Sequence, residues 1–262
     1  MKTRIEEIPT GVDVTFFESG QGQAFRSEHG IPSEALVLGH VGRLAPEKNL
    51  AYLGEAAIRG MAGREDVWLL IVGEGPSKTE IEKAVEEQGL SDRLVAPGTL
   101  TGRTLSDAYR AMDLFVFSST SETQGMVLAE AMAAGVPVVA LDASGCRDVV
   151  EDGVNGRLLP ADAPAETFSH ETLELLRNAG LMKRFKEKAY RTARSLSRET
   201  CAGRLEALYA EILAEASDNS PLYRTSLDPW DALLGGLKAE WELISRKTTA
   251  AVKSFQEAEG ND

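Results

Sequence analysis

The feature that most restricts the fold is a regular alternation of short apolar runs with longer amphipathic segments. The runs are continuously apolar, which is typical of strands covered on both faces in a parallel sheet. The segments between them have the three- to four-residue spacing of helices. This order predicts an α/β fold with a doubly wound parallel sheet. The expected strands are residues 35–42, 67–73, 93–98, 114–119 and 137–141, and the expected helices are residues 46–63, 76–90, 104–112 and 125–135.

Residues 1–216 are expected to form this domain, which ends in consecutive helices from residue 166 onward. A polar break then leads to a last amphipathic helix, so residues 217–262 are predicted to be a linker and a C-terminal helix. We expect its apolar face to dock on the domain core or on a second domain, and binding to a membrane surface is the alternative. That face consists of Trp230, Leu234, Leu237, Trp241, Ile244, Val252 and Phe255.

Charge and cysteine content restrict the partners and the compartment. A formal net charge of −13 repels the phosphates of nucleic acids, which argues against them as partners. The two cysteines, Cys146 and Cys201, form no CxxC pair, and the start of the chain lacks the pattern of a signal peptide. The apolar runs are much shorter than the roughly 20 residues that cross a bilayer. We therefore expect a cytoplasmic protein, with the inner face of the membrane as a second location.

Ligands of such a sheet bind beyond the carboxyl ends of its strands. After the first expected strand, Arg43 and Lys48 lie in a turn that opens a helix, and two cations beside free helix N–H groups favour an anion. A solvated loop with two ordinary basic residues is the alternative. After the second expected strand, Gly73 either allows a ligand to approach the backbone or only forms a turn. After the third, Leu100 either supports a planar base or belongs to the core.

Two glutamates follow the fourth expected strand, eight positions apart. Glu122 lies in the loop before Gly125, and Glu130 lies inside the helix that follows. A buried carboxylate without a partner costs several kcal/mol, so each needs a donor, either an internal amide or a hydroxyl of a sugar. Gly125 permits close approach of the backbone, and the helix from Met126 directs its first amides at the same space.

Together these motifs resemble the nucleotide-sugar-binding C-terminal domain of the retaining family-four glycosyltransferases, which have the GT-B fold. The resemblance follows the family's order along most of the chain, and the "ETQG" form is similar to a branch that includes glycolipid glycosyltransferases. The matching stretches are "IPTGVD", "GHVGRLAPEKNL", "LLIVGEGP", "SETQGMVLAEAMAAGVPVVA" and "VNGRLLP".

The resemblance implies a role for each matching residue. Arg43 and Lys48 would neutralise the donor diphosphate and stabilise the leaving group, so no metal would be required. Glu122 would contact the donor sugar near the anomeric carbon and complete the catalytic set with those two cations. Glu130 would accept hydrogen bonds from the ribose hydroxyls. The other donor-binding positions would be Gly42, Gly73, Leu100, Thr123, Gln124, Gly125, Met126 and Val127.

The same resemblance implies a partner, because the family is built from two Rossmann-like domains and only the second is matched. The chain is therefore expected to be the donor half of a retaining glycosyltransferase, inactive alone, with a UDP-, GDP- or ADP-sugar and an N-terminal acceptor domain or subunit as partners. No cofactor is implied. Gln124 stands where an aromatic residue often precedes the motif glycine, which leaves the sugar preference open. A non-catalytic nucleotide-sugar-binding module and half of a sugar-nucleotide epimerase remain alternatives.

Overall fold

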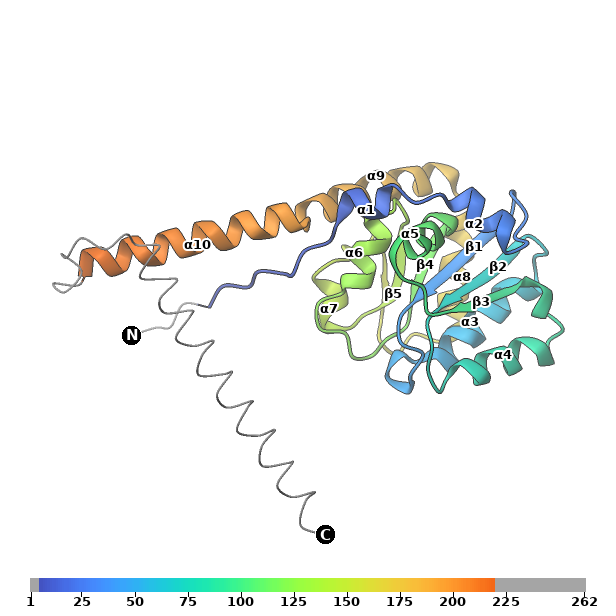
Figure 1. The fold of residues 1–262 in the computed structure, drawn as a ribbon. Coiled ribbons are helices and arrows are strands. Elements are labelled where there is room, and N and C mark those ends of the chain that lie inside the picture. The colour runs from blue at the N-terminus through green and yellow to red at the C-terminus, as the bar shows by residue number, and fades with distance from the viewer. Residues whose placement is uncertain (1–4, 220–262) are drawn as a thin grey trace, which may run out of the picture. The chain divides into compact units, whose positions relative to one another are not determined.

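The computed structural model describes residues 5–219, and these contain one parallel sheet of six strands (Figure 1). The strands are β1 (Leu36–Val41), β2 (Val67–Val72), β3 (Leu94–Gly98), β4 (Leu114–Phe117), β5 (Val138–Leu141) and β6 (Gly156–Leu159). Each of the five expected strands is present and differs from the prediction by at most two residues at either end. The doubly wound parallel sheet is therefore confirmed. The prediction did not name β6 as a strand, because this edge strand has two half-buried residues among its four and forms no continuous apolar run.

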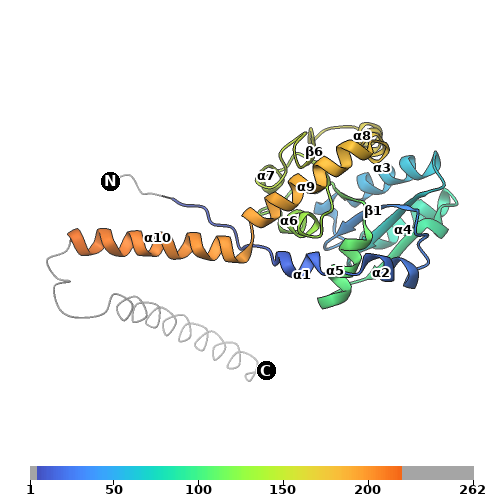
Figure 2. The ribbon, with the colours of Figure 1, turned by 90° about the horizontal axis from the view of Figure 1, so that it is seen from above.

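Helices cover both faces of the sheet (Figure 2). One face packs against α3 (Leu50–Ala62), α4 (Lys78–Glu87) and α8 (Ala165–Arg177). The other packs against α1 (Val14–Glu18), α2 (Gly22–Glu28), α5 (Gly102–Ala111) and α6 (Met126–Ala133). The remaining helical elements are η1 (Pro46–Lys48), η2 (Ser91–Arg93), α7 (Ser144–Arg147), α9 (Ala179–Ser195) and α10 (Arg198–Asn219).

Two helices that the sequence pattern did not predict precede the sheet. Each is short and buries a phenylalanine, Phe17 in α1 and Phe25 in α2, so neither shows a repeating apolar stripe. Arg26 of α2 is buried, donates to the carbonyl oxygens of Ala111 and Ala35, and forms an ion pair with Asp113 at 2.8 Å. These contacts fasten the segment to the start of the sheet.

The helix after β1 begins later than expected. Asn49 has a left-handed backbone with φ of 52°, which separates the short helix η1 from α3. Lys48 is consequently the last residue of η1, in a tight turn rather than within a long helix.

The consecutive helices expected after residue 166 are α8, α9 and the described part of α10. Residues up to Arg204 form one compact unit, and α10 continues into a second one. No helix between residues 5 and 219 is long and apolar enough to cross a membrane. The amphipathic segment from Trp230 to Phe255 lies outside the described residues, and the domain boundary at residue 216 stays a prediction.

The order of the strands creates a position for a ligand. The sheet reads β3-β2-β1-β4-β5-β6, so the chain builds outward from β1 to one side and then returns to place β4 on the other. Beyond the carboxyl ends of such a central pair, the connecting segments run in opposite directions and leave a crevice. Residues 42–48 after β1 therefore lie next to residues 118–125 after β4.

Candidate functional site

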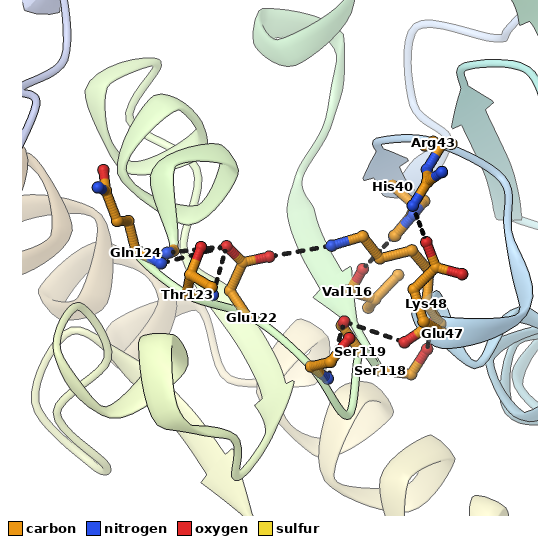
Figure 3. A network of polar contacts seen from close by, with 12 residues as sticks. His40, Arg43, Glu47, Lys48, Val116, Ser118, Ser119, Glu122, Thr123 and Gln124 are labelled. Carbon is orange, nitrogen blue, oxygen red and sulfur yellow. Dashed lines mark hydrogen bonds and ion pairs between the residues drawn. The ribbon is translucent and has the colours of Figure 1, made fainter.

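Two buried serines at the end of β4 fix the turn that follows β1. The Ser118 hydroxyl contacts the carbonyl oxygens of Lys48 at 2.9 Å and Asn49 at 3.0 Å. The Ser119 hydroxyl donates to the carbonyl oxygen of Glu47 at 3.2 Å (Figure 3). Both serines are fully buried, so these bonds are shielded from water. Segments about 70 positions apart in the chain thus become one unit.

Lys48 extends from this turn to the first motif glutamate (Figure 3). Its Nζ lies 3.1 Å from Oε2 of Glu122, and the side chains are only 18% and 13% exposed. The ammonium also lies 5.5 Å from the centre of the Phe117 ring, within the range of a cation–π contact. Because water reaches this pair poorly, we regard it as stronger than an ordinary surface ion pair.

The second oxygen of Glu122 is held by the backbone. Oε1 accepts from the amides of Thr123 at 3.1 Å, Gln124 at 3.4 Å and Gly125 at 3.1 Å. Gly125 has φ of 66°, and a Cβ there would come within 2.4 Å of the Gly145 carbonyl oxygen, so the loop requires glycine. Burial raises the pKa of Glu122, but the bonds from Lys48 and the Gly125 amide outweigh burial and leave the pKa below its usual value. This glutamate is a fixed carboxylate.

The second motif glutamate lies in a different environment on α6. Oε2 of Glu130 accepts a hydrogen bond of 2.7 Å from the hydroxyl of the buried Tyr109 on α5. Burial raises the pKa of Glu130, and the Tyr109 bond and the charge of Arg198 offset only part of this. Burial, and then the charge of Glu130, raise the pKa of Tyr109 well above its ordinary value, so its hydroxyl remains a donor. The internal contacts of Glu130 therefore support its charge less well than those of Glu122.

Arg43 is the exposed member of the predicted cation pair. Its guanidinium forms an ion pair with Glu47 of the same turn, and the Arg43 side chain is 72% exposed. Each predicted phosphate-binding cation thus contacts a carboxylate in this structure, Arg43 with Glu47 and Lys48 with Glu122. The two pairs differ mainly in burial.

The glycines after β1 and β2 lie against each other. A Cβ on Gly73 would come within 1.9 Å of the Gly42 carbonyl oxygen, so glycine is needed there to pack the two loops together. Leu100 is half buried and packs against the hydrophobic core. Their roles as donor-binding residues stay predictions, as do those of Thr123, Met126 and Val127.

An unexpected contact reaches the motif loop from the N-terminal segment. The hydroxyl of Thr10, within the "IPTGVD" stretch, donates to Oε1 of Gln124 at 2.9 Å. Sequence reasoning missed this contact and the supporting residues Glu47, Tyr109, Ser118 and Ser119. Serines directly after a buried strand were a usable signal, since that is where ligand sites form. Nothing in the pattern indicated that Tyr109 would contact Glu130.

The arrangement can bind an anion with hydroxyl groups attached. Two cations and the start of α6 favour negative charge, while two carboxylates favour hydroxyl donors. In residues 5–219 no three His, Cys, Asp or Glu side chains are grouped as metal ligands.

Comparison with known proteins adds three findings. The family model described as "Glycosyl transferases group 1" matches residues 22–192. A GDP-mannose-dependent alpha-mannosyltransferase of Mycolicibacterium smegmatis is 36% identical over 159 residues, which are 61% of this chain and 40% of that protein. A D-inositol 3-phosphate glycosyltransferase of Geodermatophilus obscurus is 34% identical over 252 residues, which are 91% of this chain and 54% of that protein. The chain thus spans about half the length of these relatives, or less.

Solved structures agree with the fold. HepE of Anabaena, in complex with UDP and glucose, gives a TM-score of 0.69 at 24% identity and covers 78% of this chain and 56% of its own. TarM of S. aureus, a mutant in complex with fondaparinux, alpha-GlcNAc-glycerol and UDP, gives a TM-score of 0.60 at 29% identity and covers 69% of this chain and 37% of its own.

Proposed function

The chain belongs to the glycosyl transferases group 1 family, and from this premise we propose that it binds a nucleotide sugar and acts as the donor half of a retaining glycosyltransferase. The observation that carries the proposal is the ion pair between Lys48 and Glu122 at the crevice shared by β1 and β4. Glu130 follows eight residues later on the same segment, as the motif requires.

In this proposal the diphosphate binds at the turn after β1. Arg43 and Lys48 carry two positive charges, and Glu47 and Glu122 cancel them in the structure described above. An exposed ion pair is worth little, so Arg43 turns readily from Glu47 to a phosphate. Lys48 has three N–H donors, of which Glu122 takes one. Both cations then stabilise the charge that develops on the departing diphosphate.

Glu122 connects phosphate binding to sugar binding. Three backbone amides hold Oε1, so Oε2 is the oxygen that can change partners. When the diphosphate attracts Lys48, Oε2 becomes able to accept a hydroxyl of the donor sugar. We therefore propose that the sugar binds more tightly once the phosphate site is filled.

Glu130 is proposed to bind the ribose. Tyr109 donates to Oε2, and in this proposal Oε1 accepts hydrogen bonds from the ribose hydroxyls. The named relatives and the solved neighbours differ in nucleotide, with GDP-mannose in one name and UDP in the structures. The base of the donor nucleotide is therefore to be identified by the titrations described below.

The acceptor is proposed to bind to a second domain or subunit. Transfer needs an acceptor hydroxyl held about 3 to 3.5 Å from the anomeric carbon, and such positioning is worth several powers of ten in rate. Closure of a cleft also removes water that would compete with the acceptor. Retention of configuration is part of the proposal and follows from the family resemblance.

Isothermal titration calorimetry of the 262-residue chain tests donor binding. UDP, GDP and ADP and their sugars are titrated with and without EDTA. We expect one base to bind clearly tighter than the others, its sugar to bind tighter than the bare diphosphate, and EDTA to change neither affinity. If no nucleotide binds to the folded chain, the proposal is wrong.

An activity assay tests whether this chain binds the donor while a second domain or subunit binds the acceptor. We expect the chain alone to show no sugar transfer above background and at most slow donor hydrolysis. Supplying the acceptor-binding half of a relative should restore transfer with retention. Robust transfer by the purified chain to a sugar or lipid acceptor would contradict the half-enzyme proposal.

A further inference from the structure

A buried histidine under the proposed donor site has an unused hydrogen-bonding atom. His40 on β1 is 0% exposed, and its Nε2 has no hydrogen-bond partner among the described residues. Leaving a buried acceptor unpaired costs on the order of 1–3 kcal/mol. The proposed function does not use this side chain, so its polar atom requires an explanation.

The internal contacts of His40 decide which nitrogen carries the proton. Nδ1 lies 3.2 Å from the carbonyl oxygen of Val116, which can only accept, so the proton is on Nδ1 (Figure 3). Burial, together with the nearby charge of Lys48 and against the opposing effect of the bond to Val116, lowers the pKa of His40 to about 4. At neutral pH the ring is uncharged, and Nε2 is a hydrogen-bond acceptor.

The loop after β1 carries no side chain at the position nearest to Nε2. A Cβ placed on Gly42 would lie 3.5 Å from Nε2 and would meet no other heavy atom within 4 Å outside its chain neighbours. Glycine at this position therefore places no side chain between the loop and the histidine. This part of the loop lies at the carboxyl end of β1, where residues 42–48 begin.

Packing alone does not require a nitrogen there. The His40 ring lies roughly parallel to the rings of Phe115 and Phe117, at centroid distances of 6.2 and 5.8 Å. An apolar ring would fill the same place without the cost of an unpaired acceptor. Nε2 is thus better explained by a group that reaches it from the crevice.

We propose that Nε2 of His40 accepts a hydrogen bond from a hydroxyl of the transferred sugar. This inference rests on the proposed function. A phosphate oxygen is excluded as the partner, because at neutral pH the oxygens of a diphosphate ester carry no proton to donate and Nε2 is itself an acceptor. The ribose is assigned to Glu130, whereas His40 lies beside Lys48, which contacts Glu122 at the sugar end of the site.

A matched pair of variants tests the proposal. His40→Asn keeps a donor near the Nδ1 position for Val116 and removes the acceptor at Nε2. His40→Gln places a side-chain oxygen near the Nε2 position. Calorimetry of the full chain uses UDP, UDP-glucose, GDP, GDP-mannose, ADP and ADP-glucose, and thermal unfolding confirms that each variant is folded.

We expect His40→Asn to bind the preferred nucleoside diphosphate within about twofold of the original chain and its sugar about three- to tenfold more weakly. His40→Gln should recover most of the lost affinity. Equal weakening of both ligands by His40→Asn, or no weakening of either, would overturn the inference. If the unaltered chain binds none of these six probes, the proposed function fails and this inference fails with it.

A second measurement needs no variant and covers the case in which His40→Asn does not fold. The chain has three histidines, so the ring nitrogens of His40 can be assigned by ¹⁵N NMR. We expect the Nε2 resonance to move on addition of the nucleotide sugar and to stay in place with the nucleoside diphosphate. The same movement with both ligands, or with neither, would overturn the proposal.

Discussion

The loop that carries Glu122 and the helix that carries Glu130 each contain a carboxylate, but the two carboxylates differ in their contacts and in the direction of their pKa shifts. In the loop, residues 118–125, a lysine and three backbone amides surround the carboxylate. Burial raises its pKa, but the bonds from Lys48 and from the amides of Gly125 and Gln124 outweigh burial and lower it. On α6, a tyrosine hydroxyl contacts the carboxylate, and burial raises its pKa.

This difference indicates that the two glutamates of the motif have different roles in binding a ligand. Glu122 is preorganised, since Oε1 is fixed by the backbone and a ligand competes with Lys48 only for Oε2. Glu130 carries a charge that its internal contacts leave under-supported, so a ligand with hydroxyl donors would complete its environment. One glutamate exchanges a partner on binding, and the other gains one.

The largest expected effect comes from removing the partner that distinguishes Glu122. Lys48→Met keeps most of the length of the side chain and removes its charge, so the diphosphate loses a charge-assisted hydrogen bond and Glu122 loses its ion pair. We expect nucleoside diphosphate affinity to fall about 10- to 100-fold by calorimetry. The matched control is Lys83→Met, which removes an exposed lysine paired with Glu87 on α4. Equal effects of the two variants would contradict the special position of Lys48.

The next effect separates the two glutamates by ligand. Glu130→Gln should weaken the nucleoside diphosphate and its sugar alike, by roughly tenfold, because both ligands contain the ribose. Glu122→Gln should weaken only the sugar-bearing ligand and leave the bare diphosphate at least as tightly bound, since Lys48 is then free of its carboxylate. Calorimetry with both ligands measures the contrast. If the variants give the same pattern, the glutamates do not have separate roles.

A smaller effect is expected on stability, with opposite signs. At pH 7, Glu130→Gln removes a poorly supported buried charge and should raise the free energy of unfolding by about 1 kcal/mol. Glu122→Gln removes a well-supported charge and should lower it by a similar amount. For a domain of this size, the midpoints of thermal unfolding should shift by about 2–4 °C in opposite directions. Shifts in the same direction would show that the two environments do not differ as described.

The pH dependence of these shifts follows from the pKa directions. Because the pKa of Glu130 is raised, the folded protein takes up a proton on this carboxylate at a higher pH than the unfolded chain does. The protonated carboxyl group therefore adds to the free energy of unfolding at pH 4.5 and below, and this contribution is lost as the pH rises through the raised pKa. The lowered pKa of Glu122 gives stability that is present above pH 4.5 and lost as the pH falls through the lowered pKa. Melting curves from pH 7 to pH 4 should therefore show the advantage of Glu130→Gln disappearing first.

The smallest effect is predicted for the exposed ion pair. Glu47→Gln frees Arg43 from a carboxylate, but exposed pairs are worth about 0–1 kcal/mol. We expect nucleoside diphosphate affinity to change by less than about threefold, as measured in the same titrations. A change as large as that of Lys48→Met would mean that burial is not what separates the two cations.

Much of the fold was predictable because burial on both faces leaves a visible signature. Five strands appear as continuous apolar runs, and the helices between them keep their period. The elements that were missed, α1, α2 and β6, bury too few residues to make a pattern. For the site, the glutamate spacing and the cations were visible in the sequence, whereas the contacts that fix them come from Ser118, Ser119 and Tyr109, whose partners are distant in the chain.

The sequence by itself determined the kind of sheet, the position of the E-x7-E motif and the presence of two cations in the turn after the first strand. The tertiary structure alone decided that β4 lies beside β1, and hence that Lys48 contacts Glu122 and not Glu130. It also left Nε2 of His40 without an internal partner beside Gly42. The physical reason is that apolar burial and local backbone preference act over a few residues, whereas the pairing of charged groups depends on which strands become neighbours.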